Sequence, residues 1–369
     1  MTPMVRIGKV TLDAPFFQAG LDGYSDAAMR MVARRHGCPY CVTEAMLDQF
    51  LINGGRGLRA AELDANDHPI AGQLMGSHPR QIAQGARILV TLGYDVIDVN
   101  LACPVKKIKK KCRGGHLLSA PEEAIAVLDA VRQAIGDDVP CTVKLRRGTD
   151  DGAQAEADFF AIFDRVITLG YAAATVHGRT VVQKYRGPSQ WSFLRRLCSL
   201  YPAAQTPGFA IMGSGDVWDA ADIFAMIDQT GVAAASVARG CIGNPWIFAQ
   251  ARALAAGDHD AAERPPTITC QRDVLTEHFR LSVALHGEKR ASLMMRKFGI
   301  KFSCHHPRPE EVRAAFIAVK SLGDWNMVLE RHYRRDGPGR RVDIEAVHTG
   351  KATDSRSCAD EISATPTTA

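Results

Sequence analysis

Residues 96–104 have the sequence VIDVNLACP, an apolar and β-branched run that ends in a cysteine and a proline. Such a run predicts a buried strand. Pro104 cannot donate to a sheet ladder, so we expect Cys103 to lie just past the carboxyl end of this strand. The basic segment KKIKKKCRGG follows directly, from Lys106 to Gly115. A thiol beside a cationic loop suggests chemistry on an anionic substrate, but a buried, inert cysteine beside a solvated charge run explains the same residues equally well.

Strand signals like this one recur along the first two thirds of the chain, with helix signals between them. The expected strands cover residues 14–20, 41–44, 70–75, 96–99, 141–146, 173–178, 209–213 and 234–238. The expected helices include 25–36, 79–92, one that opens at Pro121, and 155–169. About eight strand-then-helix units in roughly 240 residues predict an α/β protein with a parallel sheet, and the count is that of a TIM (β/α)8 barrel.

A doubly wound open sheet is the competing architecture. The barrel is favoured because polar or glycine-marked positions lie at one end of every expected strand. In a barrel the carboxyl ends of all strands converge on one mouth, where active sites are built. These positions are Gly20, Glu44, Gln73, Asn100, Lys144, His177, Ser214 and Arg239.

The remainder of the chain changes character after the last expected strand. Residues 255–266 are rich in Ala, Asp and Pro and are typical of a linker, and residues 267–335 show helical spacing of apolar positions. The polar segment after this is expected to be disordered. We therefore predict a barrel domain over 1–255, a helical domain over 267–335 and a disordered tail over 336–369.

Composition excludes several classes of protein. The 369 residues carry a formal net charge of +5, and no run of about 18 apolar residues predicts a membrane span. We expect no signal peptide. The 10 cysteines are scattered over a long chain, so we expect them to be reduced and the protein to be cytoplasmic. Two cysteine-containing motifs, Cys38-Pro39-Tyr40-Cys41 and Cys304-His305-His306, suggest redox and metal chemistry respectively, but we interpret both as structural and expect no metal site.

The strand ends resemble, in order and content, the dihydrouridine synthase family of bacterial type. These flavin enzymes reduce uridine in RNA to 5,6-dihydrouridine. The resemblance covers about residues 14–335, and several separate motifs appear in the right order. They are GLDGYSD from Gly20, QLMG from Gln73, NLACPVKK from Asn100, GGHLL from Gly114, VKLR from Val143, HGRT from His177, QKYRG from Gln183, GD from Gly215 and GNPW from Gly243.

The chain also departs from the family pattern at single positions. The family usually has Pro, Met, Asn, Gly and Arg where this chain has Gly20, Leu21, Ser214, Ala238 and Val181. The first four changes fall on the expected flavin side and keep mostly small residues. The change at Val181 falls on the expected nucleic-acid side, which leaves the exact substrate open.

The resemblance implies an activity and a set of site residues. It implies that FMN, reduced by NADPH, supplies a hydride to C6 of uracil and that Cys103 supplies a proton to C5. A thiol suits this role because its ordinary pKa lies near 8.5, although neighbouring cations could lower it. The implied cofactor-binding residues are Gly20, Leu21, Asp22, Gln73, Lys144, His177, Ser214, Gly215, Asp216, Ala238 and Arg239.

The implied substrate is RNA, with transfer RNA as the first expectation and ribosomal RNA as an alternative. The expected RNA-binding residues are Asn100, Lys106, Lys107, Lys109, Lys110, Lys111, Arg113, Arg179, Arg296 and Lys297. We expect a monomer without membrane partners. A flavin barrel that reduces a small enone or pyrimidine, and an RNA-binding protein without catalysis, are the other functions that these residues allow.

Structural explanations remain open for individual side chains. Lys144 could form a structural ion pair inside the barrel. The role of Gln73 could be limited to hydrogen bonds that hold a loop. His177 could be a satisfied core histidine. The small residues around Gly215 could form an ordinary turn instead of a phosphate site, although barrels commonly bind phosphate in their last two strand–helix loops.

Overall fold

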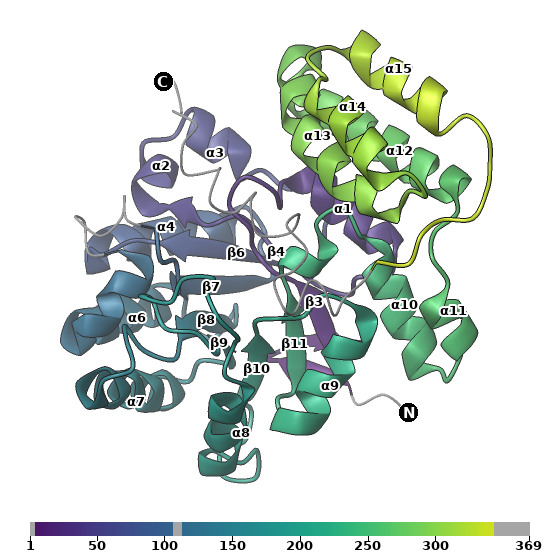
Figure 1. Ribbon diagram of the computed structural model, residues 1–369. Helices are drawn as coiled ribbons and strands as arrows, with labels where there is room; N and C mark the ends of the chain where they lie inside the picture. Colours follow the sequence, from purple (N-terminus) through teal and green to yellow (C-terminus); the bar gives the residue numbers. More distant parts are fainter. Residues whose placement is uncertain (1–3, 106–112, 343–369) are drawn as a thin grey trace. The chain divides into compact units, whose positions relative to one another are not determined.

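The computed structural model describes residues 4–105 and 113–342, which divide into two compact units between Arg239 and Gly240. In the first unit, β3, β4, β6, β7, β8, β9, β10 and β11 pair in parallel in this order, and β11 pairs with β3. This closed ring is a TIM barrel, as predicted (Figure 1). The strands are β3 (Phe16–Gln18), β4 (Cys41–Val42), β6 (Ile70–Met75), β7 (Val96–Leu101), β8 (Cys141–Arg146), β9 (Ala173–His177), β10 (Ala210–Ser214) and β11 (Ala234–Val237).

Helices follow the strands and surround the barrel (Figure 1). Pro79 and Pro121 stand in the first turn of α4 and α6, where proline's missing N–H costs nothing. Asp26 caps α1 by accepting a hydrogen bond from the Met29 backbone, as expected for a helix that starts there. The helices are α1 (Ala27–Arg35), α2 (Asp48–Ile52), α3 (Arg56–Ala60), α4 (Pro79–Thr91), η1 (Gly114–Ser119), α6 (Pro121–Ile135), α7 (Ala153–Thr168), α8 (Trp191–Leu200) and α9 (Ala220–Thr230).

The amino-terminal end of the barrel carries an antiparallel hairpin, β1 (Val5–Ile7) and β2 (Val10–Leu12). Its apolar side chains share one buried cluster with the starts of barrel strands, including Phe17, Val96 and Met212. The sequence prediction missed this hairpin and the short strand β5 (Met46–Leu47), which pairs with β6. Strands of two or three residues are too short for an alternating pattern to identify.

The second unit is helical in the part of it that the structure describes, as predicted. Trp325 is buried there, with its ring 4.7 Å from the centroid of Phe279 and 5.0 Å from that of Phe316. Its elements are α10 (Trp246–Ala255), α11 (His259–Glu263), α12 (Ile268–His286), α13 (Glu288–Phe302), η3 (Ser303–His305), α14 (Pro309–Ile317) and α15 (Leu322–His332), and the short turn η2 (Arg239–Cys241) joins the two units.

The division into compact units falls earlier than the domain boundary that we expected at residue 255. Both α10 and α11 belong to the second unit. The assignment of the expected domains to separate functions stays a prediction, and most of the expected tail lies outside the described residues. In the described part of the chain, no helix is both long enough and apolar enough to cross a bilayer.

Candidate active site at the carboxyl ends of the barrel strands

The carboxyl ends of the barrel strands bring together side chains from most of the chain's length. Because parallel strands end at the same edge, β6, β7, β8 and β9 place Gln73, Asn100, Lys144 and His177 around one mouth. A cavity lies inside this mouth. Three predicted site residues, Gly20, Gln73 and Lys144, line it together with Phe17, Ala19, Tyr40, Val42, Asp98, Thr142, Thr175, Met212 and Ser236.

A chain of hydrogen bonds connects the barrel interior to Cys103. Gln73 Nε2 donates to Asp98 Oδ2 over 2.7 Å, and Asn100 Nδ2 donates to Gln73 Oε1 over 2.7 Å. Asn100 Oδ1 then accepts from the backbone N–H groups of Ala102 and Cys103, each at 3.0 Å. The two predicted site residues Gln73 and Asn100 are therefore bonded to each other, and Asn100 holds the loop that carries the thiol.

Cys103 lies in that loop, partly exposed, directly after β7. Its carbonyl oxygen accepts from the Gly115 backbone N–H at 3.0 Å, so the two ends of the basic segment are joined. Burial raises the pKa of the thiol above its ordinary value. Our expectation that neighbouring cations could lower this pKa is not supported among the described residues, because desolvation outweighs the opposing contribution of Arg146.

Lys144 has a strongly perturbed ammonium group. Its Nζ donates to Ser214 Oγ at 3.3 Å, which brings together two predicted cofactor-binding residues. Burial lowers the pKa of Lys144 to about 8, although the Asp98 carboxylate opposes this shift. Perturbed groups of this kind in a cavity are typical of functional sites.

His177 ends β9 and accepts a hydrogen bond at Nδ1 from the Arg179 backbone N–H, 3.1 Å away. Burial, together with four nearby cationic side chains, holds its pKa well below the usual range. The imidazole is therefore neutral at pH 7. Since Nδ1 accepts, the proton lies on Nε2, which leaves this nitrogen as a donor.

The loop after β10 is built around Asp216, whose backbone has a left-handed φ of 56°. Its carboxylate accepts from Arg179 Nη2 at 2.6 and 2.7 Å and from the Ser189 backbone, and it lies 3.5 Å from Arg239 Nη2. A Cβ atom at Gly215 would approach Ser189 Oγ to 2.4 Å, so this position admits only glycine. The predicted residues Arg179, Gly215, Asp216 and Arg239 thus form one cluster.

Arg146 and Tyr185 belong to the site but were not predicted as site residues. Arg146 donates to the carbonyl oxygens of Ala102, Thr180 and Lys184, which ties the loops after β7 and β9 together. Tyr185 lies under two guanidinium groups, 5.6 Å from that of Arg146 and 5.2 Å from that of Arg239. Arg146 stands two residues after Lys144 and so points to the same face of β8, a sequence signal that could have identified it.

Other predicted residues lie in different surroundings. Leu21 is half-buried and its N–H donates to Ser25 Oγ, Asp22 is exposed, and Ala238 is half-buried after β11. Val181, a departure from the family pattern, is buried, and a Cβ atom on Gly115 would lie 2.8 Å from its methyl group.

The expected RNA-binding residues differ in their burial and in whether the structure describes them. Arg113 is buried, 3.4 Å from Asp48 Oδ1, so its side chain serves an internal ion pair. In the second unit, Arg296 is exposed and Lys297 is half-buried on α13. Asn100 and Arg179 are bonded within the site described above. Five lysines lie outside the described residues: Lys106, Lys107, Lys109, Lys110 and Lys111.

The two cysteine-containing motifs are buried to different degrees. Cys38 and Cys41 are buried with their sulfur atoms 3.9 Å apart, and burial raises the pKa of Cys41 well above its usual range. In the second unit, His305 and His306 are buried beside the half-buried Cys304. No group of three potential metal ligands occurs among the described residues.

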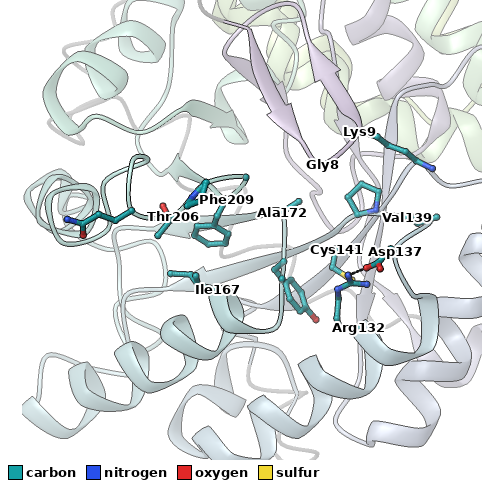
Figure 2. A pocket seen from close by; sticks show the side chains of 16 residues that line it. Gly8, Lys9, Arg132, Asp137, Val139, Cys141, Ile167, Ala172, Thr206 and Phe209 are labelled. Atoms are coloured by element: carbon teal, nitrogen blue, oxygen red, sulfur yellow. Dashed lines mark hydrogen bonds and ion pairs between the residues drawn. The ribbon is translucent and has the colours of Figure 1, made fainter.

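A second cavity opens at the opposite, amino-terminal end of the barrel (Figure 2). Gly8 and Lys9 of the hairpin turn, Cys141 at the start of β8 and Arg132 of α6 line it. None of the predicted site residues lines this cavity. The predicted catalytic and cofactor-binding residues of the barrel therefore lie at its carboxyl end.

The fold and this site define a class of protein: a TIM-barrel enzyme with its site at the carboxyl ends of the strands. Two solved structures share the fold. One is histamine dehydrogenase from Rhizobium sp. 4-9, with a TM-score of 0.53 and 16% identity; the match covers 75% of this chain and 50% of that one. The other is 2-naphthoyl-CoA reductase, with a TM-score of 0.52 and 13% identity; the match covers 69% of this chain and 52% of that one. This chain thus spans about half the length of these structures, and at such identities the likeness concerns the fold alone.

The family model for dihydrouridine synthase matches residues 17–334, and the chain belongs to this family. A probable tRNA-dihydrouridine synthase of Mycobacterium tuberculosis (strain H37Rv) is 29% identical over 345 residues, which cover 89% of this chain and 85% of that protein. The tRNA-dihydrouridine synthase B of Pseudomonas aeruginosa is 30% identical over 315 residues, covering 85% and 91%. That of Xanthomonas campestris pv. campestris is 30% identical, covering 89% and 95%.

Proposed function

We propose that this protein reduces uridine in transfer RNA to 5,6-dihydrouridine, with FMN as its bound cofactor and NADPH as the reductant. Membership of the dihydrouridine synthase family and the names of the relatives support this activity. The observation that carries the proposal is the position and protonation of Cys103. The thiol lies at the barrel mouth, partly exposed, with a pKa that burial raises, so it holds a proton at neutral pH.

The polar groups at this mouth have the chemistry that a flavin would need. A Cβ atom at Gly20 would lie 2.2 Å from the Thr43 carbonyl oxygen, so the close approach of the two backbones requires glycine at this position. Ser236 Oγ, which lines the cavity, and Arg179 Nη1 are buried without a hydrogen-bond partner among the described residues. Buried polar atoms of this kind are normally satisfied by a ligand or water. Arg239 would supply positive charge for an anionic phosphate, and Lys144 would lie against the flavin ring.

Gln73 and Lys144 would hold FMN at this mouth, and the bound cofactor would supply hydride chemistry at C6 of uracil. Cys103 then acts as general acid: its S–H bond breaks, a C–H bond forms at C5, and the thiolate is reprotonated from solvent. A charged Lys144 stabilises negative charge near the cofactor, and its pKa of about 8 keeps most of it protonated at pH 7. Neutral His177 would offer Nε2–H as a hydrogen-bond donor.

The test is direct. The purified protein is expected to carry FMN and, with NADPH, to form dihydrouridine in an unmodified transfer RNA transcript, measured by mass spectrometry of the digested nucleosides. Ribosomal RNA and a small enone serve as competing substrates. A protein that reduces either of these faster than transfer RNA, or that purifies without flavin and gains no activity from added FMN, contradicts the proposal.

A further inference from the structure

Four buried side chains form one continuous line of hydrogen bonds inside the barrel. Thr142 Oγ1 donates to Asp98 Oδ1 at 2.7 Å, and Gln73, Asn100 and the backbone of Cys103 continue the line from Asp98 Oδ2. The exposed fractions of Gln73, Asp98 and Asn100 are 2%, 4% and 7%. The line crosses three neighbouring strands, because Asp98 faces Gln73 of β6 in register on one side and Thr142 of β8 on the other.

The groups at the two ends of this line determine which atom of each amide donates a hydrogen bond and which accepts one. A backbone N–H can only donate, so Asn100 must present Oδ1 to Ala102 and Cys103. Burial raises the pKa of Asp98, while the hydrogen bonds from Thr142 and Gln73 and the charge of Lys144 favour its ionised form. An ionised carboxylate can only accept, so Gln73 presents Nε2 to Asp98. With both ends fixed, each amide between them has one orientation. The backbone donors at the Cys103 end require the same orientation of the two amides, so the line is complete only while Asp98 accepts from Gln73.

We propose that Asp98 is a positioning residue, which fixes the orientation of the Gln73 and Asn100 amides and thereby holds the loop that presents the Cys103 thiol. The inference rests on the proposed function only for its effect on turnover, because the hold on the loop is present without any substrate. Asp98 touches Gln73 and Thr142, and it acts on Cys103 through two intervening side chains.

The substitution Asp98→Asn keeps size and shape but replaces one acceptor oxygen with an N–H₂ donor. If this donor faces Gln73 Nε2, two donors oppose each other. If Gln73 rotates to accept, Asn100 must rotate as well and present Nδ2 to the backbone N–H groups of Ala102 and Cys103. In a third arrangement the amide oxygen faces Gln73 Nε2 and the amide nitrogen donates to Thr142 Oγ1, which keeps every bond but replaces a charged acceptor with a neutral one. The line is therefore broken or weakened, and a displaced reacting group costs up to about 10²-fold in rate.

Thr142→Val is the matched control. It also removes one buried hydrogen bond to Asp98, on the same strand level, but leaves Oδ2 as an acceptor and the line to Cys103 intact. The double variant Asp98→Asn/Gln73→Glu provides the rescue. There the amide introduced at position 98 donates to the carboxylate introduced at position 73, and this carboxylate also accepts from Asn100 Nδ2, so the original direction is restored.

The experiment measures two quantities on the flavin-loaded protein. One is the rate at which iodoacetamide alkylates Cys103 across the pH range, followed on the peptide by mass spectrometry. The other is kcat and KM for a transfer RNA transcript. For Asp98→Asn we expect alkylation at pH 7 to rise at least about threefold, since a loosened loop exposes the thiol and lowers its pKa. We expect kcat to fall at least about tenfold with KM nearly unchanged.

Thr142→Val is expected to leave the alkylation rate within about twofold of the parent, and the double variant is expected to return the alkylation profile to that of the parent. Equal effects of Asp98→Asn and Thr142→Val on alkylation, or an alkylation profile of Asp98→Asn like the parent's, would overturn the proposal. If Asp98→Asn is insoluble, the double variant decides: parent-like alkylation supports the proposal and a second failure overturns it. A parent protein that forms no dihydrouridine but shows this alkylation pattern rejects the proposed function and supports the positioning role.

Discussion

At the scale of single residues, the proposed function makes Cys103 the proton donor in the reduction of a pyrimidine double bond. Cys103→Ala removes the proton donor but leaves the cavity of Gln73 and Lys144 in place. We expect normal FMN content and normal reduction by NADPH, and a loss of dihydrouridine formation of about 10²-fold or more, the usual scale for a positioned general acid. Stopped-flow mixing of the reduced protein with RNA checks this, because flavin reoxidation should slow by the same factor.

The control for this prediction is Cys198→Ala. Cys198 is also half-buried, and burial raises its pKa to about 11, but it lies on α8, outside the cavity. We expect it to keep the parent rate. Dihydrouridine formation by Cys103→Ala at close to the parent rate would show that water or another group delivers the proton.

Lys144 makes a second prediction at this scale, through pH. Its pKa in the folded protein, about 8, lies below the ordinary value of 10.5. Between pH 8 and pH 10.5 the unfolded chain carries a proton on this amine that the folded chain lacks. The free energy of unfolding therefore rises as the pH increases through this range. Lys144→Met has no such group. Between about pH 7.5 and about pH 9.5 we expect the flavin-free parent to gain about 2 kcal/mol relative to this variant.

Urea unfolding of both flavin-free proteins measures the difference. Lys9→Met serves as the control, because Lys9 is exposed in the turn between β1 and β2. A free-energy difference between parent and Lys144→Met that does not change with pH would show that Lys144 is ordinarily hydrated.

At the scale of elements, the sequence predicted the strands well where apolar runs were bounded by turn residues. The expected strands at 70–75 and 141–146 have the bounds that the structure gives to β6 and β8. Closure of the ring depends on β4, two residues long, which pairs with both β3 and β6. A strand this short leaves almost no periodic signal in the sequence. The closed barrel was therefore predicted from the number of strand–helix units and not from the pairing of this strand.

The candidate site could be predicted only in part, for a physical reason. Strand ends can be read from a sequence, so Gln73, Lys144 and His177 could be placed at one mouth. Partners across strands cannot be read from it, because Asp98 and Thr142 lie 44 positions apart along the chain and meet only through sheet register. Arg113 illustrates the opposite error, since a residue that follows a run of lysines looks solvated although it is buried.

The buried pair of Arg113 and Asp48 yields a prediction about the element that it anchors. Arg113 stands directly before η1, and Asp48 starts α2. Arg113→Ala leaves a buried carboxylate without its partner, so we expect a loss of about 3–5 kcal/mol in the free energy of unfolding. Urea unfolding measures it, with the exposed Arg296→Ala, expected to stay within about 0.5 kcal/mol, as the control. A stable Arg113→Ala protein with weakened RNA affinity would return Arg113 to the RNA-binding set.

At the scale of the whole molecule, the net charge of +5 is too small to hold RNA by itself, so affinity must come from clustered cations. The sequence places two clusters far apart along the chain: the lysines at 106–111 beside Cys103, and Arg296 with Lys297 on α13. Each phosphate contact releases counterions and steepens the salt dependence of binding. The change in this slope when one cluster is removed therefore measures how many phosphate contacts that cluster makes.

Two multiple variants use this count. Replacement of Lys109, Lys110 and Lys111 by alanine should reduce the slope of log K against log salt by about 2 to 3, and Arg296→Gln/Lys297→Gln by about 1 to 2. Both should weaken binding uniformly across sequences, and we expect NADPH oxidation by an artificial acceptor to stay unchanged. Arg6→Gln/Lys9→Gln removes as many charges as the second variant, from the hairpin at the amino-terminal end, and should leave the slope as it is. Equal losses in all three variants would mean that net charge, and not two defined contact clusters, holds the RNA.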